Sequence, residues 1–301
     1  MSEPATALLG TVGDTVLSGP GGEVRIGDTH PFVMIGERIN PTGRAKLTEG
    51  FIAGDYTLAR ADAVAQVEVG ARVLDLNAGI PGYDEAAMLT GLVQAVHEVV
   101  DVPLCIDSST PEALEAAIPA ARGKVLVNSV TAEAESLERL LPLVAKHGAA
   151  VVGMANDEDG PSMDPRVRLA CARKIVEAAA GHGIAREDVV IDPIAMPIGA
   201  APDAATAMYE TVRLLRTELG VNSSCGASNI SFGMPDRQAI DAVFVPHAIL
   251  AGMNAAITNP LHRPVRKAIL AADVLLGRDA MSMAWIAAHR AETAATQGTT
   301  R

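Results

Sequence analysis

Short apolar runs alternate with longer segments of helical periodicity along most of the chain, beginning near Phe32. Each run has little polar alternation at its centre, which is typical of parallel strands buried on both faces. We identify eight such runs, at residues 33–35, 73–76, 104–106, 125–127, 150–152, 189–191, 225–230 and 255–257. The alternation predicts eight strand–helix units.

Apolar residues spaced three or four apart predict the helices between these runs. Three stripes show this spacing most clearly: Met88, Leu92, Ala95 and Val99; Leu137, Leu140, Leu141 and Val144; and Met208, Val212, Leu215 and Leu219. Pro111 and Pro165 each follow a residue type that caps helices, and glycines follow three of the predicted helices. A further helix is expected over residues 280–294.

Eight units without an intervening linker rich in Pro, Gly or Ser predict an α/β fold, the (β/α)₈ TIM barrel, over residues 31–301. An open doubly wound sheet is the alternative, but the first strand is not followed by G-x-G-x-x-G, and there is no Walker sequence. Residues 1–30 form an N-terminal extension. Within it, residues 15–26 predict a β-hairpin that turns at residues 18–22, with an unstructured tail as the alternative.

Composition narrows the class of protein. The chain has 301 residues, 49% of them apolar, which is ample for a core, and a net charge of −12 with 3% aromatic residues, which disfavours nucleic-acid binding. Three widely spaced cysteines make a disulfide framework or a cysteine zinc site unlikely. Residues 1–10 lack the basic start of a signal peptide, and no apolar run is long enough to span a membrane, so a cytoplasmic location is expected.

Every predicted strand ends in a polar side chain. These residues are Glu37, Asn40, Asp75, Asn77, Asp107, Asn128, Asn156, Asp192, Ser228, Asn229 and Asn259. In a barrel they would share the C-terminal rim, where active sites lie. Because Asp and Asn also cap helices and form turns, about half of these positions are expected to be structural.

The chemistry of such a rim points to a neutral ligand. Carboxylates accept hydrogen bonds, whereas amides both donate and accept. With almost no Lys or Arg at the strand ends, the rim suits a donor-rich heterocycle better than a phosphate. An aminopyrimidinone presents a ring N–H beside an NH₂ group, and one carboxylate can accept both.

Six motifs at these strand ends resemble one family. They are VMIGERIN followed by PTG (33–43), LDLNAG (74–79), CIDSS (105–109), VNS (127–129), IDP (191–193) and GASNIS (226–231). In this order and spacing they resemble the pterin-binding methyltransferases, namely methyltetrahydrofolate:corrinoid protein methyltransferase and the folate domain of cobalamin-dependent methionine synthase. The resemblance extends over roughly residues 31–277.

The resemblance implies roles for these residues. Asp107, Asn128 and Asp192 would bind the pterin ring, and Asn229 would reach N5, where the methyl group sits, as the catalytic residue. Asp75, Asn77 and Ser228 would line the same pocket. Possible further contacts come from Glu37, Asn40, Asn156 and Asn259, with Glu37 and Asn40 equally suited to bracing the first strand.

The resemblance also implies the reaction and its partners. A methyl group would move between N5 of methyltetrahydrofolate and the cobalt of a corrinoid (cobalamin) on a separate partner protein, in a direction that the sequence leaves open. No metal ligand set is apparent in this chain. A homodimer is expected by resemblance alone. Because His247 and His262 are expected on a helix surface or in a turn, the source of the N5 proton stays open, with solvent or a water held by Asp75 as candidates.

Two alternatives remain. A dihydropteroate synthase-like enzyme would share the barrel, but that family expects a lysine after Ser228 and an Arg-x-His pair at the eighth strand, and this chain has neither. The other alternative is a folate-binding module without turnover, which nothing in the sequence requires.

Overall fold

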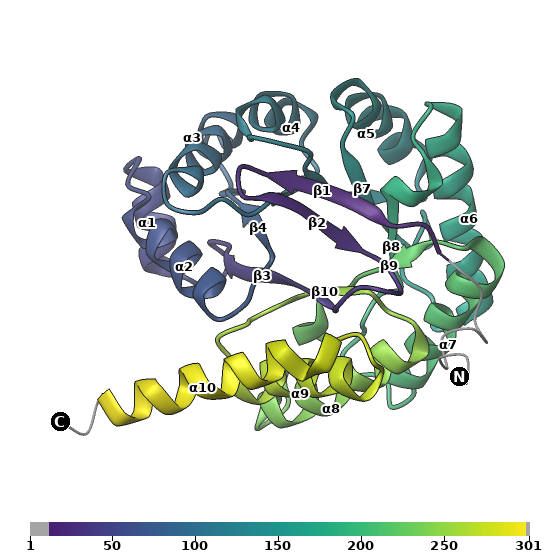
Figure 1. Ribbon diagram of the computed structural model, residues 1–301. Coiled ribbons are helices and arrows are strands. Elements are labelled where there is room, and N and C mark those ends of the chain that lie inside the picture. The colour runs from purple at the N-terminus through teal and green to yellow at the C-terminus, as the bar shows by residue number, and fades with distance from the viewer. Residues whose placement is uncertain (1–11, 299–301) are drawn as a thin grey trace.

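The computed structural model describes residues 12–298, and the barrel predicted from the sequence is present in it (Figure 1). Eight parallel strands pair in the order β10-β3-β4-β5-β6-β7-β8-β9, and a bridge between Gly226 and Ile257 joins the two ends of the sheet. The strands are β3 (Val33–Ile39), β4 (Val73–Asn77), β5 (Leu104–Asp107), β6 (Leu126–Thr131), β7 (Ala150–Met154), β8 (Val189–Asp192), β9 (Asn222–Ser223) and β10 (Ala255–Thr258). The fold is a TIM barrel.

Helices surround the strands. They are α1 (Ala45–Ile52), α2 (Thr57–Glu68), α3 (Glu85–His97), α4 (Pro111–Ala117), α5 (Ala134–His147), α6 (Pro165–Gly181), α7 (Ala204–Leu214), α8 (Arg237–Ala251), α9 (Arg263–Leu275) and α10 (Met283–Gly298). The predicted stripes at residues 137–144 and 208–219 are buried. Val99 departs from its stripe, because α3 ends at His97 and leaves the Val99 side chain 39% exposed.

The seventh strand differs from the prediction. The apolar run at 225–230 is not a strand: pairing with β8 is confined to Asn222 and Ser223, and Ala227–Asn229 form a 3₁₀ turn, η5. The prediction was wrong because a run of small, buried residues gives the same sequence pattern in a strand and in a tight turn. As a result, Asn229 is held by a turn and not by a strand.

Alternation along the strands divides the core in two. Side chains such as Val33, Ile35 and Val73 point into the barrel, whereas their neighbours, such as Leu74 and Leu76, pack against the surrounding helices. The interior set also contains Leu17, Val24 and Ile26 from the N-terminal extension.

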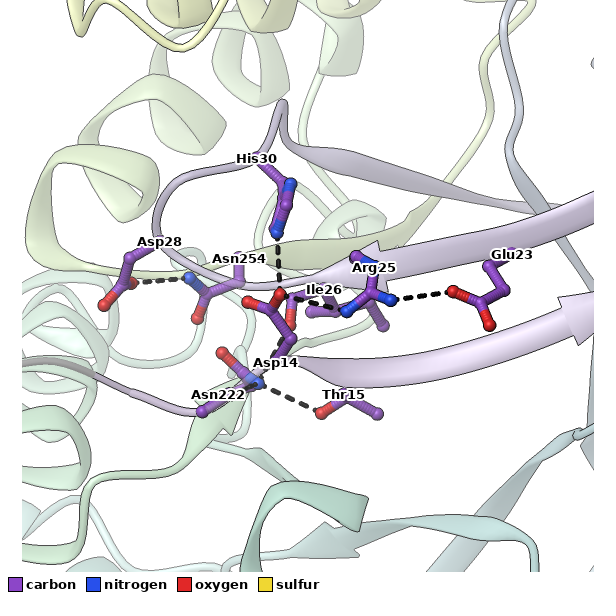
Figure 2. Close-up of polar contacts among 10 residues, drawn as sticks. Asp14, Thr15, Glu23, Arg25, Ile26, Asp28, His30, Asn222 and Asn254 are labelled. Carbon is purple, nitrogen blue, oxygen red and sulfur yellow. Dashed lines mark hydrogen bonds and ion pairs between the residues drawn. The ribbon is translucent and has the colours of Figure 1, made fainter.

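The predicted hairpin is formed by β1 (Thr15–Gly19) and β2 (Gly22–Ile26), which pair antiparallel and lie across one end of the barrel (Figure 1). Its polar attachment is shown in Figure 2. Buried Asn222 donates its amide to Thr15 Oγ1 and to the Gly13 and Ile26 carbonyls at 2.8–3.0 Å. The hairpin therefore closes the N-terminal end of the barrel. Residues 1–10, where the sequence lacks the basic start of a signal peptide, lie outside the described residues, as does Thr11.

The C-terminal helix extends along the outside of the barrel. α10 contacts α9 and continues past the barrel wall (Figure 1). It begins after a 3₁₀ turn at Ala280–Ser282, close to the predicted start. Within residues 12–298, no helix is both long and apolar enough to cross a bilayer. The three cysteines are buried and unpaired.

Candidate functional site

Strand alternation brings five of the predicted polar residues into the barrel. Each of the five lies two positions beyond an inward-facing apolar residue: Asp107 follows Cys105, and Asn128 follows Leu126. Because strand side chains repeat every two residues, these polar groups point inward at the C-terminal ends of their strands. Asp75, Glu37 and Asp192 follow Val73, Ile35 and Val190 in the same way.

These side chains surround one cavity of about 460 Å³. Seven predicted site residues line it, namely Glu37, Asn40, Asp75, Asp107, Asn128, Asp192 and Asn229. The cavity lies at the end of the barrel opposite the hairpin. Its lining in the described part of the chain contains no aromatic ring, so a planar ligand there would depend on in-plane hydrogen bonds.

Amides fix the carboxylates at the base of this cavity. Asn128 Nδ2 donates to Asp75 Oδ1 at 3.3 Å, and Asn77 Nδ2 donates to Asp107 Oδ2 at 3.0 Å. Asn77 also accepts from the Gly79 amide, which fixes which way its own amide points. The carboxylates are thereby held in place and still have acceptor capacity for a ligand.

Burial makes these carboxyl groups unusual acids. The pKa of Asp75 is raised to about 8, first by burial and then by the negative charge of Asp107 nearby. Burial also raises the pKa of Asp107. The pKa of Asp192 is raised to about 6 by burial, against the opposing effect of hydrogen bonds from the Ile194 and Gly226 backbone amides. Asp75 is therefore mostly protonated at neutral pH and can donate a hydrogen bond.

The η5 turn places Asn229 at the edge of the cavity. The backbone amide of Asn229 donates to the Gly226 carbonyl at 3.1 Å, and this hydrogen bond closes the turn. A Cβ on Gly226 would lie 2.8 Å from Asn229 Nδ2, so the glycine leaves the space that this side chain occupies. Arg237 donates to the Ser228 carbonyl at 2.5 Å and to Ser231 Oγ at 3.0 Å, which ties the turn to α8.

A second contact joins η5 to the first barrel strand. The Ser228 hydroxyl lies 3.0 Å from both carboxylate oxygens of Glu37. Burial raises the pKa of Glu37, while this hydrogen bond opposes the shift. On the other side of β3, the Arg38 amide donates to Gln66 Oε1 at 3.0 Å, and a Cβ on Gly36 would lie 2.5 Å from the same oxygen. The motif GERIN therefore contacts α2 through the Arg38 backbone and η5 through the Glu37 side chain.

The structure corrects the expectation of a rim almost without cations. Arg38 and Arg44 both line the cavity. Arg44 donates to the Arg38 carbonyl and pairs with Asp62 at 2.6 Å, and Arg38 lies 4.0 Å from the same carboxylate. The sequence contained the signal, because Arg38 belongs to GERIN and Arg44 follows PTG, but neither directly ends an apolar run.

Four predicted residues do not line the cavity. Asn77 and Ser228 act from behind it, through Asp107 and Glu37. Asn259 is buried and accepts from the Leu261 amide at 3.0 Å, which makes a turn before α9. The carbonyl of Asn156 accepts from the Ala132 amide at 2.8 Å. Asn259 therefore occupies a turn position, which is the alternative that the sequence left for such residues, whereas the contact of Asn156 is made by its backbone.

Sequence reasoning also missed lining residues without charge. They are Thr42, Ser129, Met154, Gly226 and Ile257. Met154 and Ile257 follow Val152 and Ala255 by two positions, so alternation could have identified them. Among residues 12–298, no three His, Cys, Asp or Glu side chains are grouped as a metal site.

Comparison with known proteins identifies the family to which the chain is similar. The family model described as "Pterin binding enzyme" matches residues 36–259. The chain is 32% identical over 267 residues to the methylcorrinoid:tetrahydrofolate methyltransferase of Eubacterium limosum, covering 86% of this chain and 96% of that protein. It is 29% identical over 266 residues to methionine synthase of Mycobacterium tuberculosis, covering 82% of this chain but 22% of that much longer protein.

Solved structures share the fold. The dihydropteroate synthase of Xanthomonas albilineans with 4-aminobenzoic acid matches with a TM-score of 0.66 at 19% identity, over 87% of this chain and 98% of that one. The Stenotrophomonas maltophilia dihydropteroate synthase matches with a TM-score of 0.63 at 21% identity, over 82% and 93%. At these identities the likeness establishes the barrel alone.

Proposed function

The chain belongs to the family of pterin-binding enzymes, and we propose that it is a methyltransferase acting between N5 of methyltetrahydrofolate and the cobalt of a corrinoid on a partner protein. The observation that carries the proposal is the cavity itself. Inward-facing Asp107, Asn128 and Asp192 form its base, and Asn229 stands at its edge.

The base of the cavity has the hydrogen-bonding groups that a pterin requires. The pyrimidinone edge of a pterin presents an N–H and an NH₂ group beside a carbonyl. Carboxylates of Asp107 and Asp192 accept from the N–H groups, and the amide of Asn128 can donate to the carbonyl. Hydrogen bonds to an ionised carboxylate are the stronger kind, so these contacts supply both affinity and orientation.

Transfer requires N5 to become a better leaving group. The N5–CH₃ bond breaks, the methyl carbon bonds to cobalt with the cobalt electron pair, and N5 keeps the bonding pair and takes a proton. The corrinoid supplies the strong nucleophile for this displacement. Asn229 donates a hydrogen bond toward N5 from a turn that is already in place, which stabilises the charge that develops there.

We propose that Asp75 supplies the proton that N5 takes when the methyl group leaves. Its carboxyl group lines the cavity and, with a pKa raised to about 8, holds a proton at neutral pH. It can pass that proton toward N5 through a water, and in the reverse direction it can receive it. The same residues therefore serve transfer in either direction. The cytoplasmic location and the homodimer stay predictions.

The alternative dihydropteroate synthase reaction is less consistent with the site. The cations Arg38 and Arg44 could attract a diphosphate, but the residue after Ser228 is the cavity-lining amide of Asn229, not the lysine which that reaction is expected to need. Incubation with a pterin diphosphate and 4-aminobenzoate should therefore yield no dihydropteroate.

Replacing Asn229 tests the assignment. Asn229→Ala should lower the single-turnover rate of methyl transfer by about 100-fold, as expected for loss of one donor at the reacting atom, while tetrahydrofolate binding weakens only a few-fold. Gln94→Ala, which shortens an exposed amide on the outer surface of α3, is the matched control. An unchanged transfer rate in Asn229→Ala would refute the role, and a wild-type protein that binds folate without turnover would instead be a binding module.

A further inference from the structure

The cavity is asymmetric in charge. Its base is acidic, whereas the end of β3 and the loop that follows it contribute two guanidinium groups, Arg38 and Arg44. Both share one carboxylate, Asp62, which is 12% exposed and lies 2.6 Å from Arg44 and 4.0 Å from Arg38. Two cations with one shared anion leave a positive charge at this edge. Arg38 Nε is also buried without a hydrogen-bond partner among the described residues.

A pterin ring does not account for these arginines. The ring is neutral, and its donors are matched by the carboxylates at the base of the cavity. Glu37 neighbours Arg38, but its carboxylate is turned toward the Ser228 hydroxyl at 3.0 Å. A ligand that used the whole cavity would therefore combine a neutral, donor-rich ring with an anionic extension.

The position of Asn229 indicates where that extension leaves the ring. N5 of a folate is adjacent to C6, the atom that bears the benzoylglutamate tail. With N5 at Asn229, the tail leaves on the side of η5, and the Ser228–Glu37 contact joins η5 to the strand end that bears Arg38. The two guanidinium groups thus lie on the side from which the tail emerges.

We propose that Arg38 and Arg44 form a subsite for the carboxylates of the folate glutamate tail, with Asp62 limiting its positive charge. This inference rests on the proposed function and adds the tail to what the site recognises. Guanidinium groups suit carboxylates because their planar N–H pairs match both oxygens. The subsite acts on binding and does not touch the reacting atoms.

The test compares two substrates that differ only in tail charge. One is methyltetrahydrofolate, and the other is its diamide, in which both glutamate carboxylates are carboxamides. The measured quantity is the KM of the diamide divided by the KM of methyltetrahydrofolate, with cob(I)alamin as acceptor. We expect this ratio to be about three to five in the wild-type protein, since partly exposed ion pairs contribute modestly.

Three variants and one control sharpen the result. Arg44→Gln and Arg38→Gln should move the ratio toward one, and Asp62→Asn should increase it, because the arginines lose their internal partner. Lys46→Gln removes an exposed positive charge on α1 that does not line the cavity, and it should leave the ratio at the wild-type value. Added salt should lower the wild-type ratio.

The failure of this inference is separable from failure of the proposed function. A ratio of one in the wild-type protein, or a ratio that none of the three variants changes, would overturn the subsite while methyl transfer stands. If Arg44→Gln does not fold, the KM ratio of Asp62→Asn and the salt dependence of the wild-type ratio still test whether the subsite exists. Absence of transfer from both substrates would instead refute the proposed function.

Discussion

At the scale of a single residue, Asp75 is the group to which we assign the proton chemistry of the site. It is 4% exposed, it lines the cavity, and Asp107 lies close enough for its charge to oppose ionisation. A carboxyl group in this setting is a donor at neutral pH, although carboxylates at a protein surface are acceptors. The sequence predicted the position of Asp75, but its protonation depends on burial, which no local motif encodes.

The pH profile should report this group. With a pKa raised to about 8, Asp75 is protonated below that pH and loses its proton above it, so the single-turnover rate of transfer from methyltetrahydrofolate should fall about fivefold between pH 8 and pH 9. Asp75→Asn still donates a hydrogen bond but cannot titrate. Its rate should be lower and flat over this range, and an equal fall in the variant would show that another group is responsible.

Gly226 illustrates a positioning residue. Its φ of −67° is open to any residue, so the glycine is required only because a Cβ would lie 2.8 Å from Asn229 Nδ2. Gly226→Ala should displace that amide and lower kcat about tenfold or more with little change in KM. Rapid-quench kinetics and folate titration separate the two effects. A change confined to KM would place Gly226 in binding and not in the alignment of Asn229.

At the scale of elements, period-two alternation explains most of the site. Strands whose central residues are apolar on both sides end in an inward polar residue, so the barrel order could be predicted together with Asp107, Asn128 and Asp192. The structure of the seventh unit could not be predicted in this way, because its strand, β9, comprises only Asn222–Ser223 and is followed by a turn. Asn229 was predicted through its motif. The two arginines were missed because Arg38 is next to Glu37, which was taken as the polar end of the first strand, and because Arg44 lies in the loop beyond β3.

The hairpin should contribute stability and not chemistry. Asn222 is fully buried and donates to Thr15 and to the Gly13 and Ile26 carbonyls. Asn222→Ala leaves these acceptors without their donor and should cost about 2–3 kcal/mol of unfolding free energy. Denaturant titration measures the loss. Methyl transfer at 20 °C should be retained, because the hairpin lies at the opposite end of the barrel, and loss of activity in folded protein would contradict this division.

At the scale of the whole molecule, the two ends of the barrel are different. The N-terminal end is filled by apolar hairpin residues, whereas the C-terminal end is a polar cavity of about 460 Å³ that opens outward. In the proposed reaction, a corrinoid on a partner protein would therefore approach N5 from the open end. The formal net charge of −12 counts every Asp and Glu as ionised, and three of the acidic residues in that count, Asp75, Asp107 and Asp192, line the cavity.

Anaerobic mixing of the protein with methyltetrahydrofolate and photoreduced cob(I)alamin tests the central claim most directly. The account predicts that the cob(I)alamin absorbance is replaced by that of methylcobalamin, with one tetrahydrofolate formed per methyl transferred. Methylcobalamin and tetrahydrofolate should react in the reverse direction at the same site. No spectral conversion in either direction, by folded protein that binds tetrahydrofolate, would contradict it.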